Sequence, residues 1–231
     1  MTRLSVLLSR LVCASGLACA AASMALAQGA PVSPLSAGDS WTYHVTGGLA
    51  GQPGRSEWKE YILTSKNTSN EFVVTEYEKP TRELLDAALQ AKEQPAIFST
   101  IGADLCAIDF LSKATLTGQP CTAPLKVGDS WKTNEHHFGF PADAVLKAIR
   151  SEKIKLPSGS FDAFVIEVTV PVPPEQAARP QWAAHPPVKV RGLYWYDPAI
   201  KAILKEDMQG IDASGRAVFK LVAELQEFVV R

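Results

Sequence analysis

The stretch PLKVGDSW at residues 124–131 repeats an earlier stretch, PLSAGDSW at residues 34–41. In both, the glycine can adopt a positive φ, and the aspartate and serine can close a turn through their own side chains. The tryptophan then begins a strand by placing a large ring on one face. We therefore predict that each copy is a turn that starts a strand, in a chain built from two similar halves, about 34–123 and 124–231.

Each repeated turn is followed by a strand, a polar turn and a second strand. Residues 56–78 and 148–170 both show this order and are rich in β-branched and aromatic side chains. Later in the chain, residues 188–196, 202–209 and 216–230 alternate apolar and polar side chains. In the last of these strands, one face is predicted to hold Ala217, Phe219, Leu221, Ala223, Leu225 and Val229.

Two segments bear on helix content. Apolar residues recur at helical spacing between Pro80 and Gln94, and Pro95 stops the run, so an amphipathic helix is predicted there. Residues 141–150 are ambiguous, because a proline is permitted in a first helical turn while comparison with the first half favours a strand.

These patterns together predict a mainly β fold. Alternating strands joined by short turns are typical of an antiparallel sheet with one face on a core and one facing water. We expect a single curved antiparallel sheet or partial β-barrel of about ten strands, built from two similar meanders, with one or two covering helices.

The first 27 residues have the pattern of a secretory signal peptide. Arg3 and Arg10 precede an uncharged apolar run that ends in Ala25-Leu26-Ala27. We expect cleavage after Ala27, a periplasmic or secreted location, and a single β-rich domain over residues 28–231. No later stretch reaches the ~18 continuous apolar residues of a membrane helix, so no membrane span is expected after cleavage.

The cysteines bear on redox state and anchoring. Cys106 and Cys121 would remain after cleavage, and in an oxidising compartment they are predicted to form one disulfide. A redox-active pair is the alternative, but the C-x-x-C spacing is absent. A lipoprotein beginning at Cys19 is another alternative, although residues 16–18 fit the cleavage pattern poorly.

Charge and motifs exclude several functions. The formal net charge of −1 provides no basic surface for nucleic acid, so no nucleic-acid partner is expected. His136 and His137 follow Glu135, but neighbours on a strand point to opposite faces, so no metal site is predicted. Residues 158–160 lack the G-x-S-x-G arrangement, and residues 47–54 lack a phosphate-binding glycine pattern. No catalytic residue and no cofactor is predicted.

Aromatic residues give the positive indication. Residues 171–187 contain six prolines and one tryptophan, Trp182, close to His185. A loop of this composition is a surface excursion or a functional lid. Tyr194 and Tyr196 share one face of a predicted strand. We predict Trp182, His185, Tyr194 and Tyr196 as ligand or partner contacts, against the alternative that the strand aromatics only fill the core.

The chain also resembles several uncharacterised families of exported bacterial β-proteins, catalogued as domains of unknown function. Their signature is an LxxGDSW turn, an lPxGxFDA hairpin, a YWYxP hairpin and a closing strand. The matching residues are Gly128, Asp129, Trp131, Pro157, Gly159, Phe161, Asp162, Ala163, Tyr194, Trp195, Tyr196, Pro198, Lys205, Glu224 and Leu225. Lys201 and Ala202 depart from it, since these families usually have glycine there. Some of the families have been compared with periplasmic lipoprotein-carrier folds, so the resemblance implies a fold and adds little about activity.

The functional hypothesis is a non-catalytic periplasmic protein of the binding or carrier type. Its partner would be an apolar small molecule or lipid, or an envelope protein, held within the curved sheet. The alternative is a structural or interaction module of the cell envelope that uses Pro171–Pro187 as its contact. An envelope hydrolase is the third hypothesis.

Overall fold

A computed structural model describes residues 35–65, 71–102, 108–109, 114–115, 125–133, 136–137, 140–182 and 185–231. Most of these residues belong to one antiparallel sheet of ten strands. Its strands are β1 (Ser40–Leu49), β2 (Arg55–Ser65), β3 (Glu71–Lys79), β4 (Ala96–Gly102), β7 (Ser130–Thr133), β10 (Ala144–Leu156), β11 (Gly159–Pro171), β12 (Pro187–Asp197), β13 (Ala202–Asp212) and β14 (Ala217–Val229). The predicted signal peptide and the cysteine pair Cys106 and Cys121 lie outside the described residues.

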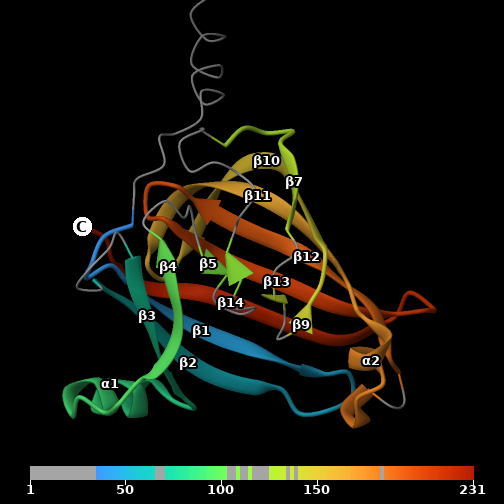
Figure 1. Cartoon of the computed structure of the whole chain (residues 1–231), viewed down its shortest axis with the longest axis horizontal. Helices are drawn as coiled ribbons and strands as arrows, with labels where there is room; N and C mark the ends of the chain where they lie inside the picture. The colour runs from blue at the N-terminus through green and yellow to red at the C-terminus, as the bar shows by residue number, and fades with distance from the viewer. Residues whose placement is uncertain are drawn as a thin grey trace, which may run out of the picture.

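The sheet is curved and open (Figure 1). Its strand order is β4-β3-β2-β1-β14-β13-β12-β11-β10-β7. Within the described residues the edge strands β4 and β7 do not pair with each other, so the arch does not close. The predicted mainly β class, with one curved antiparallel sheet, is confirmed.

Short elements complete the described chain. Two small ribbons pair β5 (Ile108–Asp109) with β6 (Ala114–Thr115), and β8 (His136–His137) with β9 (Phe140–Pro141). The helices are α1 (Arg82–Gln90), α2 (Pro174–Ala177) and the 3₁₀ turn η2 (Pro180–Trp182). None of the described helices is long and apolar enough to cross a membrane.

The two repeated turns dock on the sheet in the same way. Gly38 and Gly128 adopt φ values of 88° and 100°, in the region that favours glycine. The N–H of Gly38 donates to the carbonyl of Leu63, and that of Gly128 to the carbonyl of Ala148, both at 2.7 Å. Each turn therefore fixes the start of its strand against a neighbouring strand.

The aspartates close these turns as predicted. A carboxylate oxygen of Asp39 accepts from the N–H of Ser36 at 2.8 Å, and one of Asp129 accepts from the N–H of Lys126 at 2.9 Å. In the first turn, Asp39 also binds the buried ammonium of Lys201 at 3.0 Å. The β12–β13 connection is thereby tied to the first repeat.

Helix α1 lies on the side of the sheet away from Tyr61 and packs against β2 and β3. The hydroxyl of Thr81 accepts from the N–H of Leu84 at 3.3 Å and caps its first turn. Leu85 and Ala88 form its buried stripe, as the spacing predicted. The guanidinium of Arg82 lies 5.5 Å from the Trp58 ring centre. With its bounds at Arg82–Gln90, the helix is shorter than the predicted stretch between Pro80 and Gln94.

The structure settles one segment that the sequence left ambiguous and corrects one residue assignment. The ambiguous residues 141–150 mostly form β10, because Ala144, Leu146 and Ala148 alternate as fully buried residues. In β14 the assignment of Val229 to the inward face is wrong, since it is 50% exposed. The β1–β14 register shifts between Thr42 and Tyr43, which reverses the alternation beyond that point. Phe228 packs against the core in its place.

Candidate functional site

A cavity of about 470 Å³ lies where the last residues of β1 meet β14 and the proline-rich segment. This volume falls within the range of about 300–1,000 Å³ that is typical of small-molecule sites. Its apolar wall is made by Val45, Leu49, Trp182, Phe219 and Leu221. The cavity therefore offers an apolar surface in contact with solvent.

The alternation of side chains along β1 puts part of this wall on the inner face of the sheet. Val45, Gly47 and Leu49 follow Trp41 and Tyr43 on the inner face of β1. Gly47 carries no side chain there, and a Cβ atom would collide with the main chain of Lys220 and Leu221. Glycine at this position lets β14 approach closely and leaves the wall between Val45 and Leu49 free of a side chain.

Two aromatic rings, those of Phe219 and Trp182, add to the apolar lining. Phe219 lies over Gly210, where a Cβ would overlap its ring. Trp182 packs on Phe219, with ring centres 5.2 Å apart and planes tilted by 40°. The segment that carries Trp182 is held by local hydrogen bonds, from its N–H to the carbonyl of Arg179 and from the N–H of His185 to its carbonyl. Trp182 thus covers the cavity from a short turn.

Two of the four polar or charged residues of the lining come from β2. Arg55 and Glu57 project from it, and Gln52 and Lys220 complete the polar lining. Glu57 also belongs to a cluster that continues along the inner face of the sheet. The cavity and the charged cluster are therefore contiguous.

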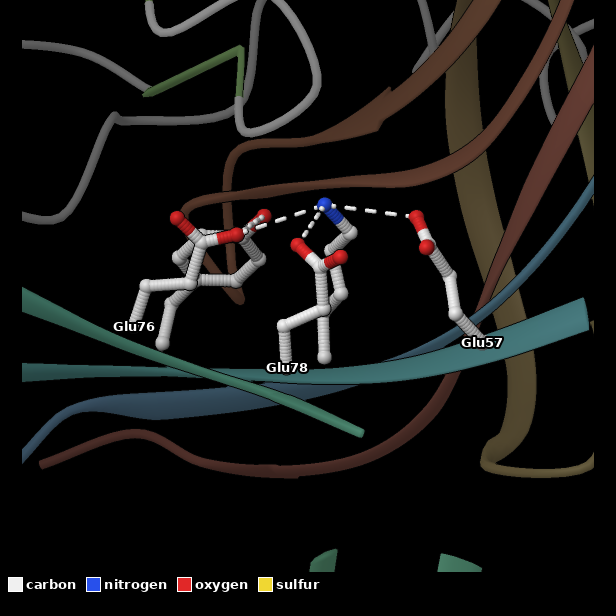
Figure 2. Close-up of polar contacts among 5 residues, drawn as sticks. Glu57, Glu76 and Glu78 are labelled. Carbon is white, nitrogen blue, oxygen red and sulfur yellow. Dashed lines mark hydrogen bonds and ion pairs between the residues drawn. The ribbon is translucent and has the colours of Figure 1, made fainter. Parts of the chain in front are cut away.

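The cluster is centred on the ammonium of Lys59 (Figure 2). Its nitrogen lies 3.3 Å from a carboxylate oxygen of Glu57, 3.3 Å from one of Glu76 and 2.7 Å from one of Glu78. The hydroxyl of Tyr61 donates to Glu76 at 3.2 Å. An ammonium has three N–H donors, so these three carboxylates match its capacity.

Burial and charge act in opposite directions in this cluster. Burial alone would lower the pKa of Lys59, but the hydrogen bond to Glu78 and the charges of Glu76 and Glu57 raise it above its ordinary value. Burial raises the pKa of Glu57, and its nearness to Glu78 adds to this, while Lys59 partly offsets both. Burial and Glu76 raise the pKa of Tyr61. The cluster is an ionic network on the inner face of the sheet and contains no group prepared as a nucleophile.

Of the four contacts predicted from the sequence, Trp182 lies at the cavity. His185 is exposed and is joined to Trp182 only through the main chain. Tyr194 and Tyr196 are 0% and 3% exposed and belong to the core cluster around Ile166 and Met208, and they do not line this cavity. Burial raises the pKa of the Tyr196 hydroxyl.

The other cavity residues were not predicted from the sequence. Glycines normally weaken a strand, but the structure extends β1 through Gly47 and Gly48 to Leu49. Phe219 and Leu221 were assigned to the inward face, but nothing indicated that they meet Trp182. Among the described residues, no group of three or more His, Cys, Asp or Glu is arranged to hold a metal ion.

No family model and no curated protein matches this chain. Among solved structures, it is similar to a predicted exported protein with a YmcC-like fold from Bacteroides fragilis, at 11% identity and a TM-score of 0.41, over 87% of this chain and 99% of that one. It is also similar to a predicted lipoprotein from Parabacteroides distasonis, at 12% identity and a TM-score of 0.40, over 85% and 97%. A LolA superfamily protein from Nitrosomonas europaea shows 13% identity and a TM-score of 0.23, over 84% and 86%. Likeness at this level assigns neither a ligand nor an activity to the present chain.

Proposed function

We propose that this is an exported, non-catalytic protein of the binding or carrier type, which holds an apolar ligand in the cavity beside Trp182. The observation that carries the proposal is the cavity of about 470 Å³ with an apolar wall, covered by Trp182 and Phe219. The predicted signal peptide supports an extracytoplasmic location.

The driving force would be burial of apolar surface. Transfer of apolar area from water contributes roughly 25 cal/mol per Å². Val45, Leu49 and Leu221 supply aliphatic surface, and the Trp182 ring supplies a flat aromatic one. A ligand with a long apolar portion would therefore gain contact with both aliphatic and aromatic surface.

An uncharged, environment-sensitive dye, N-phenyl-1-naphthylamine, tests the proposal. We expect the fluorescence of the dye to rise on addition of the protein. Trp182→Ala should weaken dye binding about fivefold, because the Trp182 ring is removed and only the Phe219 ring remains to contact the dye. Trp58→Ala is the matched control, since Trp58 stacks on His44 on the other face of the sheet, with ring centres 4.8 Å apart. Absence of any fluorescence rise, or equal weakening by both substitutions, would contradict the proposal.

A further inference from the structure

Arg55 is the exposed first residue of β2 and lies on the lining of the cavity. It pairs in the sheet with Gly47 of β1. Within the part of the chain that the structure describes, no carboxylate forms an ion pair with its guanidinium. A positive charge is therefore available beside the apolar wall of the cavity.

The other charged groups of the lining have partners. Lys220 lies 3.2 Å from a carboxylate oxygen of Asp207. Glu57 is paired with Lys59 at 3.3 Å. Lys59 is shared with Glu76 and Glu78, so this cluster has three carboxylates for one ammonium, and Arg55 is the cation of the described lining that has no carboxylate partner.

The sheet around Arg55 is rich in glycine. Gly47 pairs with Arg55 and lies against the main chain of Lys220 and Leu221, and Gly48 and Gly54 flank the same turn. Leu49 and Leu221 continue the apolar wall from this point. A guanidinium presents several N–H donors in a fixed plane that matches the oxygens of a carboxylate or phosphate.

We infer that the ligand is an anionic amphiphile, whose oxyanion head group binds Arg55 and whose hydrocarbon chain lies along the wall of Val45, Leu49 and Leu221 toward Trp182. This inference rests on the proposed function, because it requires that the cavity hold an apolar chain. Carboxylate and phosphate head groups share the recognised chemistry, so both are tested.

The experiment is displacement of the dye by four compounds with the same chain: hexadecanoate, hexadecyl phosphate, hexadecan-1-ol and hexadecylamine, each below its aggregation concentration. Wild-type protein should bind the two anions more tightly than the alcohol, and the amine most weakly. Arg55→Gln should weaken the better-bound anion about fivefold to tenfold and change the affinity for the alcohol less than about twofold. A larger effect on one anion identifies that head group.

Lys220→Gln is the matched control, because Lys220 alternates along β14 with the cavity residues Phe219 and Leu221 and already pairs with Asp207, and it should change the affinity for either anion less than about twofold. Added salt should weaken binding of the anions and leave the alcohol unaffected. Equal affinities for alcohol and anions in the wild type, or no selective loss in Arg55→Gln, would overturn the inference and leave the proposed function standing. Failure of all four compounds and of the dye would overturn both.

Discussion

The buried ion pair between Lys201 and Asp39 joins two distant parts of the chain. Their side chains are 1% and 0% exposed, and nitrogen and oxygen are 3.0 Å apart. Lys201 has a φ of 58°, in the region that glycine adopts most easily, and the sequence resemblance indicated glycine at this position. The unfavourable backbone conformation is thus accompanied by a charge contact that glycine could not make.

Removal of the Lys201 ammonium should therefore destabilise the fold. Lys201→Met leaves the Asp39 carboxylate buried without its cation, and we expect a loss of about 3–5 kcal/mol in the free energy of unfolding by urea. Lys205→Met is the control, since Lys205 forms a more exposed pair with Glu224, and its loss should stay below about 1 kcal/mol. Similar losses in the two variants would show that the buried pair has no special role.

The Lys59 cluster predicts a pH-dependent phenotype. In Lys59→Met, three neighbouring glutamates lose their shared cation, so the pKa of Glu57, which burial already raises, should rise further in the folded state. A group whose pKa is raised by folding contributes stability below its unfolded pKa, and this contribution is lost as the pH rises through the folded pKa. The variant should therefore be destabilised at neutral pH and recover toward about pH 5, as followed by thermal melting. A deficit that is equal at both pH values would contradict this assignment.

Glu57→Gln provides the opposite test of the same network. Burial raises the pKa of Glu57, so ionisation of this group works against folding as the pH rises. The neutral amide should leave stability at neutral pH unchanged or slightly increased, since Lys59 keeps Glu76 and Glu78. A clear loss of stability at neutral pH would show that all three carboxylates are needed.

Strand β13 is predicted to be sensitive at Gly210. A Cβ there would overlap the Phe219 ring, so Gly210→Ala should displace the ring, cost about 1–3 kcal/mol and weaken dye binding at the cavity. Gly54→Ala is the control, because its Cβ would meet only the Gly47 carbonyl oxygen at an ordinary 3.6 Å. Urea unfolding and dye titration on both variants give the comparison. Unchanged dye binding in Gly210→Ala would show that Phe219 does not contribute to the binding site.

The elements were largely predictable from local pattern, and the exceptions have physical causes. Alternation located β12, β13 and β14 because each carries one buried face. It could not locate the register shift opposite Thr42 and Tyr43, since a bulge depends on the partner strand. It also could not show that β1 continues to Leu49, because a glycine pair normally weakens a strand, whereas here Gly47 permits close approach of β14.

In the molecule as a whole, one open arch holds two core clusters and the cavity. Trp41 and Tyr61 belong to one cluster, and Tyr194 and Met208 to the other. The sequence predicted the arch and selected Trp182, but the cavity could not be predicted. It arises where β1 and β14, separated by most of the chain, meet a short turn, and such a meeting depends on tertiary structure.

The central claim is that the cavity beside Trp182 binds a hydrocarbon chain. The most direct measurement is a crystal structure of the protein grown with saturating hexadecanoate. The account predicts chain density between Leu49, Leu221 and the ring of Trp182, with the carboxylate near Arg55. Density for the chain at another site, or a cavity without ligand at saturation, would contradict it.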